Sequence, residues 1–388
     1  MNTVIPKIRM GFVGGGEGSF IAQAHHQAAG LDGRFELVCG AFSRDAKNNE
    51  RTAKRLGLAP SRCYSTWQSM LEAERALPAD QRMELLVIVT PNHLHAPVAA
   101  EALAAGFHVF SEKPAALSLA ELQGLKTRLD SSAGLYGLAH TYLGYPMVWQ
   151  ARQMVRDGVI GHVRKVLVEY PQGWLSQDMA GQGNKQAEWR GQPALSGVGG
   201  CIADIGTHAF SLAEFVADQT VTHLCASLGV HVEGRQLDDD CAMLLKMAQG
   251  ASGVLIASQV CAGEENSLSI RVYGDKGGLE WRQEQPASLI HRSLDQPMRV
   301  LRSGTGQPWL CEAATRRMRL PAGHPEGYLE AMANLYGDFA TAIRTGGVDN
   351  AAPGVPGIDV GLRGMAFIEA ALASHSSDVK WTPLECHA

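Results

Sequence analysis

The chain has no large excess of charge of either sign and no hydrophobic run long enough to cross a membrane. Its 34 lysine and arginine residues against 39 aspartate and glutamate residues give a net charge of −5. Proteins that bind nucleic acid or an anionic membrane surface usually carry a basic surface, so the composition argues against both classes. The chain also reaches a strand-like segment almost at once, without the apolar segment of a signal peptide. We therefore expect a cytoplasmic protein.

The cysteines lack the spacing of a disulfide framework or a metal site. Eight of them are scattered from Cys39 to Cys386, without a C-x-x-C pair. This usage indicates reduced thiols. His93 and His95 are close in sequence, but no third ligand accompanies them, so we expect no metal.

The length predicts two domains, because 388 residues with 45% hydrophobic content exceed one ordinary core. In the first third, short apolar segments alternate with helix-like segments. Such an alternation predicts a doubly wound parallel sheet. The expected strands are residues 8–13, 35–41, 85–89, 106–111 and 135–140.

A glycine-rich turn follows the first expected strand and precedes an expected helix at 20–31. Gly14 and Gly16 occupy the first two places of the pattern G-x-G-x-x-G, and Ser19 stands at the third. Such a turn brings the backbone close to a pyrophosphate at the helix N-terminus. The predicted cofactor contacts here are Gly14, Gly15, Gly16, Gly18, Ser19 and Phe20.

The end of the second expected strand bears on the choice between NAD and NADP. An acidic residue there usually binds the ribose 2′-hydroxyl of NAD. This chain has Ser43 and Arg44 instead, and a guanidinium group can pair with a 2′-phosphate. The pattern favours NADP over NAD. If Arg44 instead caps the loop or pairs with Asp45, NAD remains acceptable.

Asp204 and His208 follow a glycine pair and are four residues apart. In a helix this spacing places both side chains on one face. A carboxylate can orient an imidazole that titrates near neutral pH, which suits acid/base catalysis. From the spacing alone, such a pair is more often an ordinary surface hydrogen bond, so that interpretation stays open.

Further motifs complete a recognisable set. Thr90-Pro91-Asn92 with His95 follows the third expected strand, and Glu112-Lys113-Pro114 follows the fourth. Together with the glycine turn and Asp204-x-x-x-His208, they resemble the glucose-fructose oxidoreductase/inositol dehydrogenase/rhizopine catabolism (Gfo/Idh/MocA) family. The resemblance implies a Rossmann domain over residues 1–143. It also implies an α+β domain over 144–388 with a large, mostly antiparallel open sheet, and a substrate between the two domains beside the nicotinamide.

The resemblance also assigns roles to individual residues. The implied catalytic residues are Lys113, Asp204 and His208. The implied cofactor contacts outside the glycine turn are Ser43, Arg44, Thr90, Pro91, Asn92, His95, Glu112, Lys113 and Pro114. The chain departs from the family pattern in the later position of His25 and in His140-Thr141-Tyr142, where an Asn-x-Arg-like segment is more frequent.

The chemistry of alcohol oxidation suits these residue types. His208 can accept the hydroxyl proton, and Asp204 can hold the imidazole or bind the reacting hydroxyl. Lys113 can stabilise the developing charge on oxygen or can itself accept the proton. Both assignments of Lys113 remain open at this point.

The long segment 174–198 is rich in glycine and glutamine, and a loop of this length is usually functional. In the family it covers the substrate pocket, so Trp174, Trp189 and Arg190 are candidates for sugar or cofactor contact. Oligomer packing is the alternative. The remaining substrate candidates are Tyr142, His324 and Tyr328, beside Lys113 and His208.

The second half reads as strands followed by two helices. Expected strands are 162–170, 241–247, 251–260, 268–273 and 279–282. We expect a helix beginning at Pro325 and ending near Arg344, a last helix over 361–374 that packs back on the body, and a solvated loop at Asp238-Asp239-Asp240. An open sheet must cover its exposed face, so we expect a homodimer or homotetramer through it.

These observations predict an NAD(P)-dependent dehydrogenase or reductase. Its substrate would be the secondary hydroxyl, or the corresponding ketone, of a sugar, cyclitol or sugar derivative. Three alternatives stay open: a glycosidase using NAD as an internal redox catalyst, a non-catalytic nucleotide sensor, and an aldose–aldose oxidoreductase with tightly held NADP.

Overall fold

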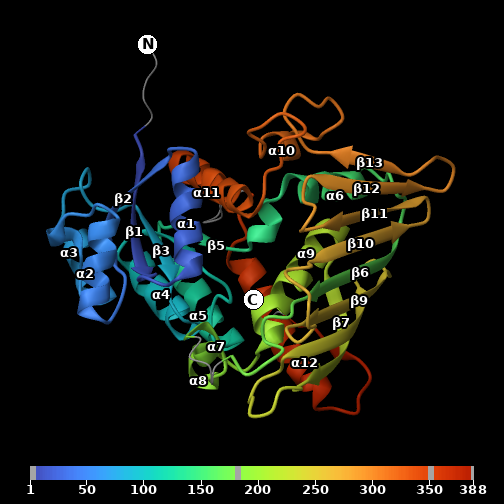
Figure 1. Cartoon of the computed structure of the whole chain (residues 1–388), viewed down its shortest axis with the longest axis horizontal. Coiled ribbons are helices and arrows are strands. Elements are labelled where there is room, and N and C mark those ends of the chain that lie inside the picture. The colour runs from blue at the N-terminus through green and yellow to red at the C-terminus, as the bar shows by residue number, and fades with distance from the viewer. Residues whose placement is uncertain (1–5, 180–184, 348–353, 386–388) are drawn as a thin grey trace. The chain divides into compact units, whose positions relative to one another are not determined.

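The computed structural model describes residues 6–179, 185–347 and 354–385. Contacts divide the chain into two compact units (Figure 1). The first comprises Met1–Ala139 and Met332–Gly361, and the second comprises His140–Ala331 and Leu362–Ala388. The chain thus returns to the first unit after most of the second. The boundary at residues 143 and 144 stays a prediction.

The first unit contains a five-stranded parallel sheet in the order β2-β1-β3-β4-β5. Every residue of β3 is buried, which explains its uninterrupted apolar sequence. The predicted doubly wound sheet is confirmed. Its strands are β1 (Ile8–Gly14), β2 (Phe35–Ala41), β3 (Leu85–Val89), β4 (His108–Ser111) and β5 (Tyr136–Leu138), and its helices include α1 (Phe20–Leu31), α2 (Ala46–Arg55), α3 (Trp67–Ala76), α4 (His95–Ala104) and α5 (Leu119–Asp130).

The direction in which strands are added reverses at β1, between its neighbours β2 and β3. Ligands of such sheets bind beside the carboxyl ends of the strands at this point. Gly14 ends β1 directly beside Val89, the last residue of β3. A Cβ at position 14 would lie 2.8 Å from the carbonyl oxygen of Val89, and φ is +86°. Only glycine meets both conditions without strain, so the turn brings the glycine motif against Thr90.

The second unit contains a nine-stranded sheet in the order β13-β12-β11-β10-β6-β9-β8-β7-β14. Its only parallel pair in the described residues is β6 with β9, so the predicted, mostly antiparallel sheet is confirmed. The strands are β6 (Val163–Pro171), β7 (Val221–Gly229), β8 (Asp240–Met247), β9 (Ser252–Ser258), β10 (Ser269–Gly274), β11 (Gly277–Arg282), β12 (Ser288–Ser293), β13 (Arg299–Arg302) and β14 (Thr382–Pro383).

Helices cover one face of this sheet (Figure 1). Helix α9 (Thr207–Ala217) packs on β6, β9 and β10, and α6 (Pro146–Arg156) packs on β11 and β12. In α12 (Ile358–His375), Phe367 stacks on Phe210 of α9. The last predicted helix therefore packs back on this unit, through its part beyond residue 361.

Several predicted bounds need correction. Helix α11 spans Tyr328–Thr345, so Pro325 precedes the helix instead of opening it. The segment 174–198 holds two short helices, α7 (Lys185–Arg190) and α8 (Pro193–Ser196), while residues 180–184 lie outside the described part. The smaller elements are η1 (Pro60–Arg62), η2 (Asn92–Leu94), η3 (Thr141–Gly144), η4 (Ile202–Gly206) and α10 (Glu312–Thr315). Among the described residues, no helix has both the length and the apolar character required to span a bilayer.

Candidate active site

The glycine turn is fastened to α2. The Glu17 N–H donates to Asn48 Oδ1 at 2.9 Å and to Thr52 Oγ1 at 3.1 Å. Arg51 pairs with the Glu17 carboxylate at 2.9 Å. A Cβ at Gly16 would lie 2.5 Å from Asn48 Oδ1, so the second glycine of the motif allows this contact. The glycine turn is therefore held in place by α2, whereas the helix that directly follows the turn is α1.

The helix after the turn begins as a phosphate-binding helix should. Ser19 caps α1, its hydroxyl accepting the Ala22 N–H at 3.4 Å. N–H groups of a first helical turn have no acceptor within the helix and attract anions. Nearby, Thr90 Oγ1 is buried and has no hydrogen-bond partner in the described part of the chain. The N–H groups of the first turn of α1 and the Thr90 hydroxyl are therefore suited to bind a dinucleotide pyrophosphate.

The predicted cofactor site is exposed at two of its residues. Phe20, at the start of α1, is 72% exposed, and Arg44, after β2, is also exposed. The Ser43 hydroxyl accepts the Asp45 N–H at 3.1 Å, and Asp45 caps α2 by accepting the Asn48 N–H at 2.9 Å. The Asp45 carboxylate thus serves the helix cap.

One buried imidazole joins the turn Glu112-Lys113-Pro114 (the Lys113 turn) to the turn Thr90-Pro91-Asn92 (the Thr90 turn). His95 is 1% exposed, with Nδ1 2.7 Å from the Pro114 carbonyl oxygen and Nε2 2.8 Å from the Thr90 carbonyl oxygen. Burial lowers the pKa of His95, against the effect of these two contacts. Lys113 itself is half-buried. His95 thus acts on the site through the backbone of both turns.

In the second unit, Asp204 and His208 lie where a π-helical turn meets an α-helix. Asp204 belongs to the π turn η4, and His208 to the first turn of α9. Gln259 Nε2 donates to Asp204 Oδ2 at 2.9 Å, and Arg190 Nε lies 3.3 Å from the same oxygen. The Asp204 carboxylate is therefore held by a strand end and by α7. π turns often mark functional sites.

His208 is surrounded by aromatic rings. Its ring centroid lies 4.8 Å from that of Tyr142 and 5.2 Å from that of His140, both nearly perpendicular. The Tyr142 ring lies 6.2 Å from Tyr328. His208 is 9% exposed, so this packing fixes the imidazole orientation.

Polar groups extend from Tyr142 in a connected network. Tyr142 and Tyr170 share a hydrogen bond between their hydroxyls. The Tyr170 hydroxyl donates to Asn266 Oδ1 at 2.7 Å, and Asn266 Nδ2 donates to the Tyr142 hydroxyl at 3.1 Å. Gln172 joins through Asn266, and Trp174 Nε1 donates to Gln172 Oε1 at 3.0 Å. Hydroxyl and amide groups on an aromatic wall are suited to a polyol.

The acidic run after residue 237 is a buried anchor, so the predicted solvated loop is wrong for Asp238 and Asp239. Asp238 accepts the Gly200 N–H at 2.6 Å and the Ile202 N–H at 2.7 Å. Its carbonyl accepts the Cys201 N–H at 2.7 Å. Asp239, 1% exposed, accepts the His231 N–H at 2.9 Å and pairs with Arg235 at 2.9 Å. Asp238 therefore holds the start of the segment that carries Asp204 and His208.

The structure gathers most predicted residues within their own units. In the first unit, the glycine turn, Thr90-Pro91-Asn92 and Glu112-Lys113-Pro114 follow the neighbouring strands β1, β3 and β4. In the second, Tyr142, Tyr328 and Trp174 join His208 through the contacts above. Trp189 stacks on Arg190 with 4.4 Å from the guanidinium carbon to the ring centroid. His324 is exposed in a loop, with Nδ1 3.2 Å from the Pro321 carbonyl oxygen.

Sequence reasoning missed several members of this region. They sit on separate strands or in loops, and their residue types are ordinary there. Only the buried position of Tyr170 in an alternating strand offered a signal. The missed residues are His140, Tyr170, Gln172, Asp238, Gln259 and Asn266.

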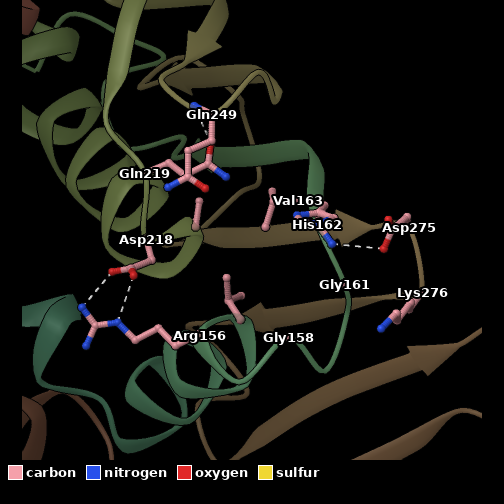
Figure 2. Close-up of a pocket in the computed structure, with 12 residues that line it drawn as sticks. Arg156, Gly158, Gly161, His162, Val163, Asp218, Gln219, Gln249, Asp275 and Lys276 are labelled. Carbon is pink, nitrogen blue, oxygen red and sulfur yellow. Dashed lines mark hydrogen bonds and ion pairs between the residues drawn. The ribbon is translucent and has the colours of Figure 1, made fainter.

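A hollow of about 480 Å³ lies elsewhere in the second unit (Figure 2). It is lined by the ends of α6 and α9 and by two strand turns, including Gln219, Gln249 and Lys276. Arg152 and Arg156 both bind Asp218 at its edge, at 2.8 and 2.9 Å. None of the predicted site residues lines this hollow.

Comparisons agree with the class that the fold and site define, an NAD-binding oxidoreductase. Residues 8–140 match the oxidoreductase family with an NAD-binding Rossmann fold, and residues 148–280 match the Gfo/Idh/MocA C-terminal domain. The oxidoreductase YfiI of Bacillus subtilis is 31% identical over 96% of both chains. The chain belongs to the Gfo/Idh/MocA family.

Solved structures show the same similarity. An oxidoreductase from Sinorhizobium meliloti is 42% identical, with a TM-score of 0.86 over 97% of this chain and 99% of that one. An inositol dehydrogenase homologue from Azotobacter vinelandii, in complex with NADH and myo-inositol, is 32% identical. Its TM-score is 0.89 over 97% of both chains. The resemblance stated from the sequence motifs is confirmed.

Proposed function

We propose that this oxidoreductase transfers hydride between a nicotinamide cofactor and the secondary hydroxyl, or the corresponding ketone, of a sugar, cyclitol or sugar derivative. The observation that carries the proposal is the surroundings of His208. A buried imidazole lies beside Tyr142, whose hydroxyl belongs to a network with Tyr170 and Asn266. An acid/base group next to hydroxyl and amide partners suits a polyhydroxylated substrate. The myo-inositol bound by the Azotobacter homologue has this chemistry.

We assign the proton chemistry to three side chains. His208 accepts the proton from the substrate hydroxyl, and its ring is kept in place by His140 and Tyr142. Asp204, held by Gln259 and Arg190, binds the reacting hydroxyl or the imidazole. The cationic Lys113 stabilises charge on the oxygen. When bound, the nicotinamide supplies the hydride acceptor.

We further propose that the cofactor site accepts NADP as well as NAD. The residues that would hold the pyrophosphate are the glycine turn and the first turn of α1. Ser43 stands where an acidic residue would favour NAD, and the exposed Arg44 follows it. NADH in the Azotobacter homologue supports NAD, and Arg44 supports NADP. We also propose a homodimer or homotetramer through the open sheet of the second unit.

The test is nicotinamide absorbance with the purified protein, NAD or NADP, and a panel of sugars, cyclitols and sugar acids. A rise with one substrate class establishes the activity and the cofactor preference. Silence across the panel, with cofactor binding intact, contradicts the dehydrogenase. Cleavage of a glycoside without net reduction would then identify a glycosidase.

Variants test the residue assignments. Lys113→Ala and His208→Ala should each lower turnover by about two to four orders of magnitude, because each removes electrostatic or acid/base assistance. Cofactor binding, measured by NADH fluorescence, should persist. His162→Ala is the matched control, since this histidine is exposed and is not one of the predicted site residues. Near-wild-type turnover in either variant rejects the role of that residue.

A further inference from the structure

His25 in α1 links two distant parts of the first unit. Its ring is fully buried, at 0% exposure. Nδ1 lies 2.7 Å from the hydroxyl of Tyr336, and Nε2 lies 2.9 Å from Oε1 of Glu112. The other carboxylate oxygen of Glu112 accepts the N–H of Lys113 at 3.1 Å. One chain of contacts therefore runs from α11 through α1 to the Lys113 turn.

The direction of the hydrogen bonds follows from the chemistry of the end groups. A carboxylate oxygen only accepts, so Nε2 of His25 carries the hydrogen. The neutral ring then has a lone pair at Nδ1, to which the Tyr336 O–H donates. Each donor has one acceptor, and the series of hydrogen bonds ends on the Glu112 carboxylate. Burial raises the pKa of Glu112, but the hydrogen bond from His25, together with the charge of Lys113, outweighs burial and lowers it.

The surroundings keep the chain of contacts rigid. Tyr336 lies fully buried between aromatic rings, with centroids 4.8 Å from Phe110 and 5.3 Å from Phe35. The titratable groups that face Glu112 are His25, Lys113 and His95. His26 and Tyr336 face His25. No role in binding substrate or cofactor was assigned above to His25 or Tyr336.

We propose that His25 and Tyr336 are positioning residues for the Lys113 turn. Tyr336 fixes the His25 tautomer, His25 fixes the Glu112 carboxylate, and Glu112 holds the backbone N–H of Lys113. The catalytic consequence rests on the function proposed above for Lys113. The hydrogen-bond arrangement does not, and it is measured separately.

The first measurement uses the wild-type protein and no substrate. ¹⁵N NMR of labelled histidine distinguishes the two neutral tautomers. We expect His25 as the Nε2–H tautomer, with the assignment made by loss of its signals in His25→Gln. An Nδ1–H tautomer in the wild-type protein overturns the proposal whether or not any substrate is found.

The second measurement uses Tyr336→Phe, which removes only the hydroxyl. We expect kcat to fall by about five- to thirty-fold, as for one lost hydrogen bond in a buried network. We also expect the acidic limb of the pH profile of kcat/KM to shift upward, because Glu112 holds its proton more easily when the His25 tautomer is no longer fixed. KM for the substrate should change little.

The matched control is Tyr64→Phe, a half-buried tyrosine of the same unit whose hydroxyl donates to Glu74 Oε1 at 2.9 Å. It loses a hydrogen bond that is not one of the Glu112 contacts, so a structural effect alone predicts the same result for both variants. A wild-type pH profile and tautomer in Tyr336→Phe contradict the proposal. If no substrate is found, the His25 spectrum of the wild type and of Tyr336→Phe still decides the hydrogen-bond arrangement.

Discussion

Two neighbouring histidines illustrate how surroundings decide a residue's behaviour. His25 has a partner at each ring nitrogen, whereas His26 stacks on Phe12 with 4.0 Å between ring centroids. Burial, and then the neighbouring His25 and Arg55, lower the pKa of His26 from 6.5 to about 4. The unfolded chain therefore binds a proton on this ring between pH 6.5 and 4, and the folded chain does not.

This difference predicts acid sensitivity of the first unit. Because the unfolded state binds more protons in this interval, the free energy of unfolding falls as pH is lowered from 6.5 to about 4. One unit of pKa is worth about 1.4 kcal/mol, so His26 contributes a loss of roughly 3 kcal/mol. Urea unfolding of the wild type and His26→Phe over this pH range measures the contribution as the difference in slope.

The control substitution is His324→Phe at an exposed loop position, which should retain the wild-type pH dependence. Equal slopes for the wild type and His26→Phe would contradict the assignment. His95 is also buried with a lowered pKa, so some acid sensitivity should survive in His26→Phe.

At the scale of elements, the start of the catalytic segment depends on one buried carboxylate. Both oxygens of Asp238 accept backbone N–H groups, of Gly200 and Ile202. An asparagine keeps one acceptor and turns an NH₂ group toward an N–H. Asp238→Asn should cost about 1–3 kcal/mol of unfolding free energy. Because the segment carries Asp204 and His208, kcat should fall by about ten-fold or more.

The matched control is Asp275→Asn, which also weakens a carboxylate contact to a backbone N–H, that of His162 at 3.0 Å. Asp275 lies in a strand turn and should lower stability without lowering kcat. If both variants keep wild-type kcat, Asp238 acts on stability alone. Thermal unfolding and steady-state kinetics measure the two effects.

The same segment shows where sequence reasoning succeeds and where it stops. Gly14, Lys113 and His208 could be named as candidates from the sequence, because their proposed chemistry needs particular residue types within a few positions of one another. The spacing of Asp204 and His208 was interpreted as one α-helical face, but Asp204 lies in a π turn. Nothing local in the sequence specifies that turn, since its anchor Asp238 is 34 residues away from Asp204.

Contacts between strands were harder to predict than strands. The uninterrupted apolar run of β3 and the alternating burial pattern of β6 were sufficient to predict both strands from the sequence. Tyr142, Tyr170 and Asn266 meet only after the sheet forms, and their separations of 28 and 96 residues leave no periodic pattern. The strands β7, β12, β13 and β14 were not predicted. Of these, β13 is only four residues long and mostly exposed, so it has no apolar face to recognise.

For the whole molecule, the open face of the nine-stranded sheet predicts the assembly. Leu244 on β8 and Ile256 on β9 are 45% and 36% exposed, on strands whose alternate residues are buried. Leu244 pairs with Val254, and Val254 pairs with Leu167 on β6, so the apolar row crosses three strands. Apolar rows of this kind on soluble proteins usually mark contacts with another chain.

We expect the wild-type protein to sediment as a dimer or tetramer and the double variant Leu244→Lys, Ile256→Lys to sediment as a smaller species. In a two-fold interface each substitution occurs twice, so four added charges would lie in the buried contact. Val379→Lys is the control, since Val379 is 66% exposed outside the strands. Sedimentation velocity at micromolar protein concentration measures the size of each species. A monomeric wild type rejects assembly, and an unchanged mass in the double variant means that the chains associate through another surface.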